Sequence, residues 1–230
     1  SVMNKKIEEN PTAFHSVENA LSRTEQYIEE NQKSLSIIVL AIVVIVGGYL
    51  GYKKLYLEPK NREAQADMYM AEQYFEQDSF KLALNGDGQN FGFLEIIDEY
   101  SVTKAANLAQ YYAGICYLRT GAYEDAIEHL EKFDAEDIMI GTIALGAIGD
   151  CYMELDDKEE AVSFYLKAGA RKKNSFTSPL YLKKAGMVME DMQQYDKALK
   201  AYETIKKDYP ESEEGKQIDK YIAALKIKMK

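Results

Sequence analysis

One sequence motif occurs three times in the C-terminal part of the chain. The segment NLAQYYAGICYLRTGAYEDAIEHLEKF (107–133) recurs as TIALGAIGDCYMELDDKEEAVSFYLKA (142–168) and as PLYLKKAGMVMEDMQQYDKALKAYETI (179–205). Each copy has a small residue seven places into its first helical stretch and another that opens its second stretch: Gly114, Gly149, Gly186, and Ala126, Ala161, Ala198. A repeat of this kind predicts a stack of helical hairpins.

The spacing and the large residues narrow the type of repeat. The equivalent alanines lie 35 and 37 positions apart, near the ~34 residues of a helix–turn–helix repeat. Large residues follow the glycines (Tyr117, Tyr152, Met189) and the alanines (Leu130, Tyr165, Tyr202). We expect the small residues to let the two helices of a hairpin approach closely, and the large ones to fill the gap between hairpins. This is the tetratricopeptide repeat (TPR) pattern, and it predicts an all-α superhelix of about four hairpins.

A divergent first copy precedes these three. ADMYMAEQYFEQDSFKLAL (66–84) places Ala71, Tyr74 and Ala83 in the same roles, and its second helix is interrupted by NGDGQN (85–90) before FGFLEIIDEY (91–100). The predicted TPR domain spans 58–210, with repeats near 64–100, 107–140, 142–175 and 179–210. A capping helix is predicted over 211–230, since repeat arrays need a polar end for solubility.

An uncharged stretch of eighteen residues, Leu35–Tyr52, precedes the repeats. It predicts a single transmembrane helix over 35–57, because ~20 apolar residues cross the hydrocarbon core, and residues 1–34 then form an N-terminal tail. The alternatives are a buried core helix and a cleaved signal peptide, although a leader of this length with more glutamates than basic residues disfavours the latter. Three glycines form a candidate surface for packing another membrane helix: Gly47, Gly48 and Gly51.

Nothing in the sequence predicts catalysis. The net charge is −10, which disfavours nucleic acid as a partner, and no cofactor, metal or catalytic motif is present. Cys116 and Cys151 occupy equivalent repeat positions, so they are either buried packing residues or a disulfide. His129 is expected to be exposed. The alternating Asn85, Asp87 and Gln89 lack the later ligands of a calcium loop. We therefore expect neither an enzyme nor a metal or cofactor site.

The remaining candidate for a functional site is a binding surface. In stacked hairpins the first helices line a concave groove. The positions expected to face it, as a partner groove, are Met68, Glu72, Phe75, Tyr111, Ile115, Arg119, Asp150, Met153, Glu154, Lys183, Met187 and Glu190. Such a groove would suit an extended, partly apolar peptide with basic residues, and the alternative is a solvated helical face. The asparagine of the TPR carboxylate clamp is replaced by Ile115, Asp150 or Met187, so that clamp is not expected.

The layout resembles a family of bacterial envelope proteins, the ancillary SecYEG translocon subunits of the YfgM-like group. The resemblance rests on YIEENQKSL (27–35), the apolar stretch, KKLYLEPKNREAQADMYMAEQYF (53–75) and the repeats. It implies a single-pass protein of the bacterial inner membrane with a cytoplasmic N-terminus and a periplasmic TPR domain. Its implied partners are the Sec translocon, envelope chaperones and secreted clients. The 85–90 insertion departs from the family pattern.

The orientation and assembly have alternatives. Lys53, Lys54, Lys60 and Arg62 outnumber the basic residues of the N-terminal flank, so the positive-inside rule alone would place the repeats in the cytoplasm. The resemblance favours the periplasm, and a 34-residue tail is awkward to translocate without a signal. The alternative function is a structural scaffold or a homo-oligomeric component of another envelope complex.

Overall fold

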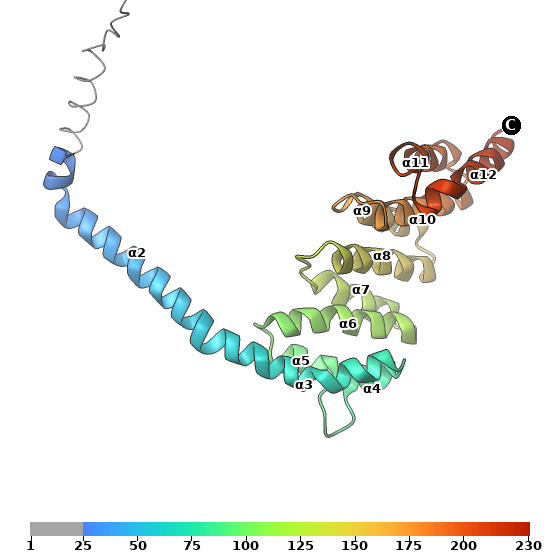
Figure 1. The fold of residues 1–230 in the computed structure, drawn as a ribbon. Coiled ribbons are helices and arrows are strands. Elements are labelled where there is room, and N and C mark those ends of the chain that lie inside the picture. Colours follow the sequence, from blue (N-terminus) through green and yellow to red (C-terminus); the bar gives the residue numbers. More distant parts are fainter. Residues whose placement is uncertain (1–24) are drawn as a thin grey trace, which may run out of the picture. The chain divides into compact units, whose positions relative to one another are not determined.

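The computed structural model describes residues 25–230, and every regular element in this part of the chain is a helix (Figure 1). The chain divides into two compact units, which meet between Tyr56 and Leu57. The first unit contains the apolar segment, and the second contains the repeats. Each unit is described by itself below.

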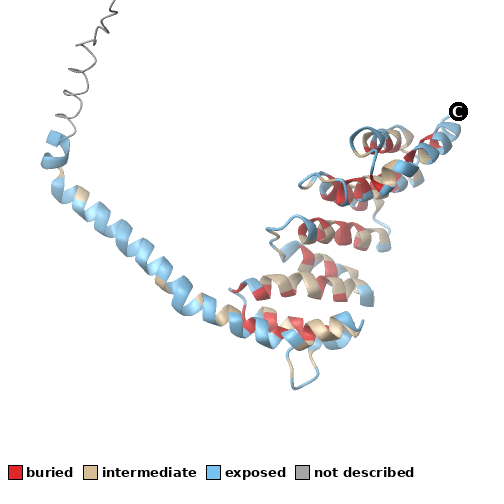
Figure 2. Cartoon of the chain, viewed as in Figure 1, coloured by how far each residue is buried: buried red, intermediate tan, exposed pale blue. Residues whose placement is uncertain are grey.

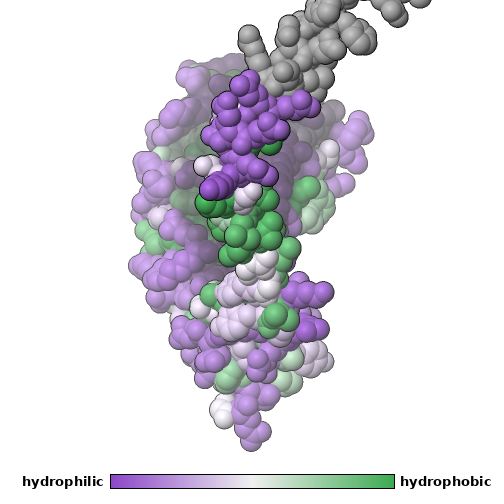
Figure 3. All heavy atoms as spheres, turned by 90° about the vertical axis from the view of Figure 1, so that its left-hand side faces the viewer, coloured by the Kyte–Doolittle hydropathy of each residue, from purple (hydrophilic) through white to green (hydrophobic). Residues whose placement is uncertain are grey.

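The apolar segment forms α2 (Gln32–Tyr52), followed by a π-helical turn, η1 (Lys53–Leu57). None of the residues of α2 is buried (Figure 2). Its hydrophobic side chains gather between hydrophilic ends (Figure 3). Within residues 25–230 the continuous helix Gln32–Glu76 is the one that is long and apolar enough to cross a membrane. The lack of burial argues against a core helix and fits a membrane anchor or a signal sequence.

The second unit consists of four hairpins and a final helix. The first hairpin pairs α3 (Glu58–Glu76) with α4 (Phe80–Asn85) and α5 (Phe93–Glu99). The next three pair α6 (Lys104–Thr120) with α7 (Tyr123–Lys132), α8 (Met139–Glu154) with α9 (Lys158–Ala170), and α10 (Thr177–Asp191) with α11 (Tyr195–Asp208). The last helix is α12 (Glu213–Lys228). First helices pack on neighbouring first helices, so the hairpins stack in chain order (Figure 1).

Side-chain caps explain several helix starts. Thr103, Asp157 and Ser212 each accept a hydrogen bond from the backbone N–H three residues later. Such a cap satisfies one of the amide donors that a helix leaves unpaired at its start. The fold is therefore an all-α TPR array preceded by a long apolar helix.

Close approach within each hairpin depends on a glycine of its first helix. A Cβ added at Gly114 would lie 2.5 Å from Leu130, and one at Gly149 would lie 2.6 Å from the Tyr165 ring. The expectation that the large residues fill only the gap between hairpins was therefore incomplete, because each also packs against the glycine of its own hairpin. Tyr165 additionally stacks on Tyr181 of the next hairpin, so one ring serves both contacts.

The turns between paired helices share one backbone geometry. One residue in each turn has a positive φ: Asp78 (55°), Gly121 (83°), Asp156 (60°) and Gln193 (59°). The next residue's N–H donates to a carbonyl five residues back, for example Ala122 to Tyr117 and Ser79 to Tyr74. The first hairpin thus repeats the turn of the other three, although its second helix is interrupted.

This geometry makes Gln193→Gly a stabilising substitution. Gln193 holds the left-handed conformation that costs a side-chain-bearing residue ~1 kcal/mol and glycine almost nothing. We expect the free energy of unfolding to rise by about 0.5–1 kcal/mol in urea denaturation monitored by circular dichroism. The matched control is Gly121→Ala, which should lower it by a similar amount. If both substitutions changed the free energy of unfolding in the same direction, the left-handed conformation of Gln193 would be contradicted.

Candidate partner groove

A hollow of about 750 Å³ lies along the first helices of the array. Seven of the side chains predicted to face a partner groove line it: Phe75, Tyr111, Ile115, Arg119, Asp150, Met153 and Glu154. Six more lining residues were not predicted: Leu118, Tyr123, Ile143, Ala147, Tyr181 and Lys184. Leu118 could have been found from its helical spacing of three residues from Ile115. We call these thirteen residues the partner groove.

The other five predicted residues lie elsewhere. Met68 is only 3% exposed and belongs to the core cluster of Phe93 and Ile96, because α5 packs against α3. Glu72 is half-buried, and burial and then the nearby Glu76 raise its carboxyl pKa. Neither residue lines the groove.

The remaining three predicted positions lie on α10, near α12, which packs against it. The Lys183 ammonium lies 4.8 Å from the centre of the Tyr221 ring. Glu190 accepts hydrogen bonds from Tyr202 (3.1 Å) and Lys228 (2.7 Å). Met187 is exposed but does not line the hollow. The last helix therefore engages this end of the first-helix surface.

Asp150 is the polar centre of the partner groove. Its carboxylate accepts a hydrogen bond from the Tyr165 hydroxyl (2.6 Å) and an ion-paired one from Lys184 (2.7 Å). Burial, followed by this hydrogen bond, raises the pKa of Tyr165 far above its ordinary value. Burial, followed by the Asp150 charge, raises the pKa of Tyr181 to about 12. Both phenols therefore remain neutral hydrogen-bond donors at physiological pH.

Aromatic and aliphatic side chains surround this polar centre. Phe75, Tyr111 and Tyr181 come from three different hairpins. Glu154 accepts a hydrogen bond from Tyr123 (3.2 Å) at one side of the hollow. The arrangement offers apolar pockets for side chains and a few placed charges to orient a chain, which is typical of peptide-binding surfaces.

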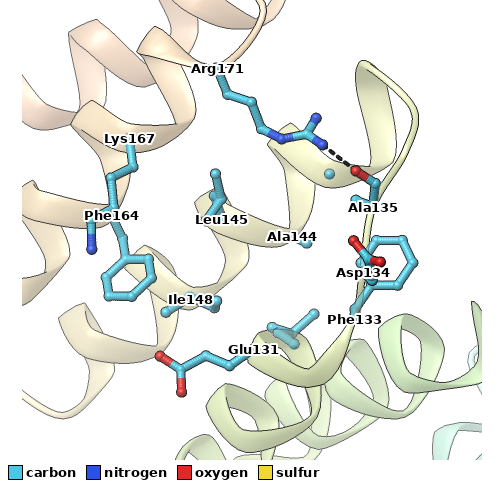
Figure 4. A pocket seen from close by; sticks show the side chains of 12 residues that line it. Glu131, Phe133, Asp134, Ala135, Ala144, Leu145, Ile148, Phe164, Lys167 and Arg171 are labelled. Carbon is cyan, nitrogen blue, oxygen red and sulfur yellow. Dashed lines mark hydrogen bonds between the residues drawn. The ribbon is translucent and has the colours of Figure 1, made fainter. Parts of the chain in front are cut away.

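A second hollow, of about 540 Å³, lies between α7, α8 and α9 (Figure 4). Both of its cations are already engaged: Arg171 donates to the carbonyl oxygens of Ala135 and Asp137, both at 2.6 Å, and the Lys167 ammonium lies 4.1 Å from the centre of the Phe164 ring. Gly141 leaves the space that the guanidinium occupies. Arg171 thus holds the loop between α7 and α8, and we do not assign it a ligand.

The candidate reactive groups have structural roles. Cys116 and Cys151 are free, buried thiols whose pKa burial raises to about 12. His129 is half-buried rather than exposed as predicted, because it pairs with Gln110 (2.7 Å) and stacks on Tyr117. Burial lowers the pKa of its imidazole. All three side chains contribute to packing.

The insertion loop is organised around Asp87. Its carboxylate accepts hydrogen bonds from the Tyr74 hydroxyl, the backbone amides of Gln89 and Asn90, and the Asn90 side chain. These donors, with Tyr74 first, hold the pKa of Asp87 well below its usual range. The loop is therefore tied back to α3.

The three glycines of α2 have open surroundings. A Cβ added at Gly47, Gly48 or Gly51 would meet no atom within 4 Å. Among the described residues of the first unit, none packs on these positions, so the face remains available to a second helix.

These features define a solenoid of helical hairpins with a hollow along its first helices, and comparison with known proteins identifies the repeat. One tetratricopeptide repeat model matches residues 108–136 and 183–212, and a second such model matches 144–175. The chain thus carries a TPR array after an N-terminal apolar helix. The first hairpin lies outside the matched segments, and its shared turn geometry is what relates it to the others.

Solved structures show the same fold at low identity. The crystal structure of the MamA protein is similar over 70% of this chain and 87% of its own, with a TM-score of 0.51 and 21% identity. A Podospora anserina putative kinesin light chain with nearly identical TPR-like repeats is similar over 74% and 87%, with a TM-score of 0.52 and 14% identity. No curated protein sequence matches significantly.

Proposed function

We propose that the chain is a membrane-anchored interaction protein whose partner groove binds an extended peptide segment of another protein. The observation that carries this proposal is the groove itself, where aromatic and aliphatic side chains from successive first helices surround the Asp150 carboxylate. TPR arrays lack catalytic machinery of their own and act through such surfaces. The protein is therefore proposed to be a scaffold and not an enzyme.

The chemistry of the groove suggests its ligand. Asp150 and Glu154 favour a segment with a basic side chain, and the rings of Tyr111 and Tyr181 favour apolar neighbours on that segment. A basic ligand group could replace Lys184 as the partner of Asp150, which is about two-fifths exposed and so remains accessible. The proposed ligand is an extended segment that alternates apolar and basic residues.

The location follows from the resemblance noted in the sequence. We propose a single-pass protein of the bacterial inner membrane with a cytoplasmic tail and a periplasmic TPR domain. There it would associate with the Sec translocon and dock secreted clients or periplasmic chaperones. The exposed apolar surface of α2 supports an anchor, the resemblance supports the Sec partners, and the resemblance together with the 34-residue tail supports a periplasmic TPR domain.

One observation favours a second candidate, a homo-oligomeric scaffold of another envelope complex. Gly47 and Gly51 lie one helical turn apart on an open surface of α2, a spacing that lets two membrane helices approach closely. Replacing both glycines by isoleucine would disrupt such an oligomer and leave the groove unaltered.

Site-specific photocrosslinking in the native membrane tests the groove. A crosslinking amino acid at Ile115, inside the groove, should capture translocon subunits, exported proteins or chaperones. The same amino acid at the exposed Tyr69 of α3, which does not line the hollow, is the control. Adding Asp150→Lys should reduce the Ile115 adducts about tenfold, since ~1.4 kcal/mol of like-charge repulsion against a basic ligand group corresponds to that factor.

The adducts discriminate between the candidates. Adducts with a second copy of this chain, abolished by the paired Gly47 and Gly51 substitutions, would favour the homo-oligomer. Equal capture at Ile115 and Tyr69 would contradict a specific groove.

A further inference from the structure

The two edges of the TPR array differ in chemistry. One edge consists of the turns inside the hairpins: 77–79, 121–122, 155–157 and 192–194. The other consists of the loops between hairpins, 100–104, 133–139 and 171–177, together with the first turn of α3. We call the first the turn edge and the second the loop edge.

Contacts run without a break along the loop edge. Asn61, in the first turns of α3, accepts a hydrogen bond from the Ala105 amide (2.9 Å) at the start of α6. Asn107 and Asp134 exchange two hydrogen bonds, of 2.7 and 2.9 Å. Arg171 and Lys172 then bind carbonyl oxygens of the same 133–139 loop. The three loops therefore lie side by side and begin at the start of α3.

Each loop of this edge exposes large apolar side chains. Phe176 is 72% exposed, Val102 53% and Ile138 49%, with Met139 beside Ile138. Each loop backbone makes hydrogen bonds: Asn174 accepts from the amides of Phe176 and Thr177, Asp137 accepts from the Ile140 amide, and the Tyr100 carbonyl accepts from the Thr103 amide. An ordered series of exposed apolar residues in three successive loops indicates a surface that is covered in use.

The turn edge has the opposite character. Leu155, at 36%, is the one large hydrophobic residue exposed in its four turns. Acidic side chains outnumber the basic Lys81, Lys158 and Lys197 there and in the adjoining helix ends: Asp78, Glu124, Asp125, Asp156, Asp157, Glu159, Glu160 and Asp191. The loop edge instead carries Lys104, Arg171, Lys172 and Lys173 beside its acidic residues. Like-charge repulsion would thus keep the turn edge away from any anionic lipid surface and leave the loop edge free to approach one.

The connection of the chain makes a lipid surface the candidate cover of the loop edge. The loop edge starts at the first turns of α3, and α3 begins at Glu58, directly after the apolar segment ends. If α2 is a membrane anchor, this connection tethers the TPR unit to a bilayer and keeps a lipid surface at high effective concentration beside it. We propose that the loop edge, through Phe176, Ile138, Met139 and Val102, contacts the interfacial region of the bilayer. This inference rests on α2 being a membrane anchor.

A single introduced tryptophan can test the contact, because the natural chain contains none. Full-length protein is placed in lipid nanodiscs with plain or brominated acyl chains, and the quenching of fluorescence by bromine is compared. Phe176→Trp probes the loop edge, Leu155→Trp is the matched control on the turn edge, and Leu50→Trp within α2 reports whether the anchor is inserted. All three native side chains are exposed, so the substitutions should leave the fold intact, as circular dichroism can verify.

The expected result is strong quenching of Leu50→Trp, and quenching of Phe176→Trp several-fold greater than that of Leu155→Trp, with a blue-shifted emission. If Leu50→Trp is quenched while Phe176→Trp behaves like Leu155→Trp, the membrane contact is overturned and the anchor stands. A blue shift of Phe176→Trp without quenching would assign the cover to protein and would also overturn it. If Leu50→Trp is not quenched, the anchor fails, and this inference fails with it.

Discussion

Replacing Tyr202 by alanine should destabilise the TPR array by about 3–5 kcal/mol, the range for truncating a large buried aromatic side chain. Tyr202 is fully buried, its ring packs against Gly186, and its hydroxyl donates to Glu190 at 3.1 Å. The substitution leaves a cavity in the last hairpin and removes this hydrogen bond. Urea denaturation of the full-length chain in detergent, followed by circular dichroism, measures the loss.

Two controls make the Tyr202 result specific. Tyr69→Ala, at an exposed tyrosine of α3, should change stability by less than about 0.5 kcal/mol. Gly186→Ala should destabilise the native chain, because its Cβ would clash with the Tyr202 ring, but should cost much less when Tyr202 is already alanine. Additive effects of the two substitutions would contradict the proposed contact, since residues in contact couple.

Placing arginine at both Leu40 and Val44 should release the protein from membranes. Each arginine near the centre of a membrane helix costs about 2.5–3.5 kcal/mol on insertion scales. We expect the double variant to move from the carbonate-resistant pellet to the soluble fraction. The matched control places arginines at Gln65 and Tyr69, also four residues apart and exposed on α3, and should stay membrane-bound. Release of both variants, or of neither, would contradict an anchor at α2.

The same preparation separates an anchor from a signal peptide and determines the orientation. Mass spectrometry of the mature chain should find residues of the apolar segment, which a cleaved signal would lack. Gln89→Cys, in the exposed insertion loop, should react with an impermeant maleimide in spheroplasts if the repeats are periplasmic. Cys116 and Cys151 should not react with the maleimide, because both are buried and their thiol pKa is raised to about 12.

The architecture could be predicted because small residues recur at the same position of each repeat. Gly114, Gly149 and Gly186 recur where two helices must touch, and this constraint acts within one hairpin. It is therefore visible in a single sequence without knowledge of distant contacts. The apolar segment is equally local, since its length alone suffices to predict a helix that could cross a membrane.

The groove was less predictable because its ends depend on neighbouring elements. Met68 occupies a first-helix position like Tyr111, but α5 follows the insertion and packs on α3, which places Met68 in the core. At the other end, Glu190 and Lys183 interact with α12. Lys184 was missed since its role arises from Asp150, a residue 34 positions earlier. Sequence periodicity identifies the central first helices and does not locate the elements that close each end.

The two hollows lie at the same junction of the array. The partner groove and the hollow beside Arg171 both use α8, the first through Ala147 and Asp150 and the second through Ala144 and Ile148. The buried cluster at this junction is also smaller than the clusters on either side of it. The hairpin stack should therefore bend most easily here, because fewer buried side chains resist bending at this junction. A ligand that fills one hollow would stiffen this point and change the curvature that the whole protein presents to a larger assembly.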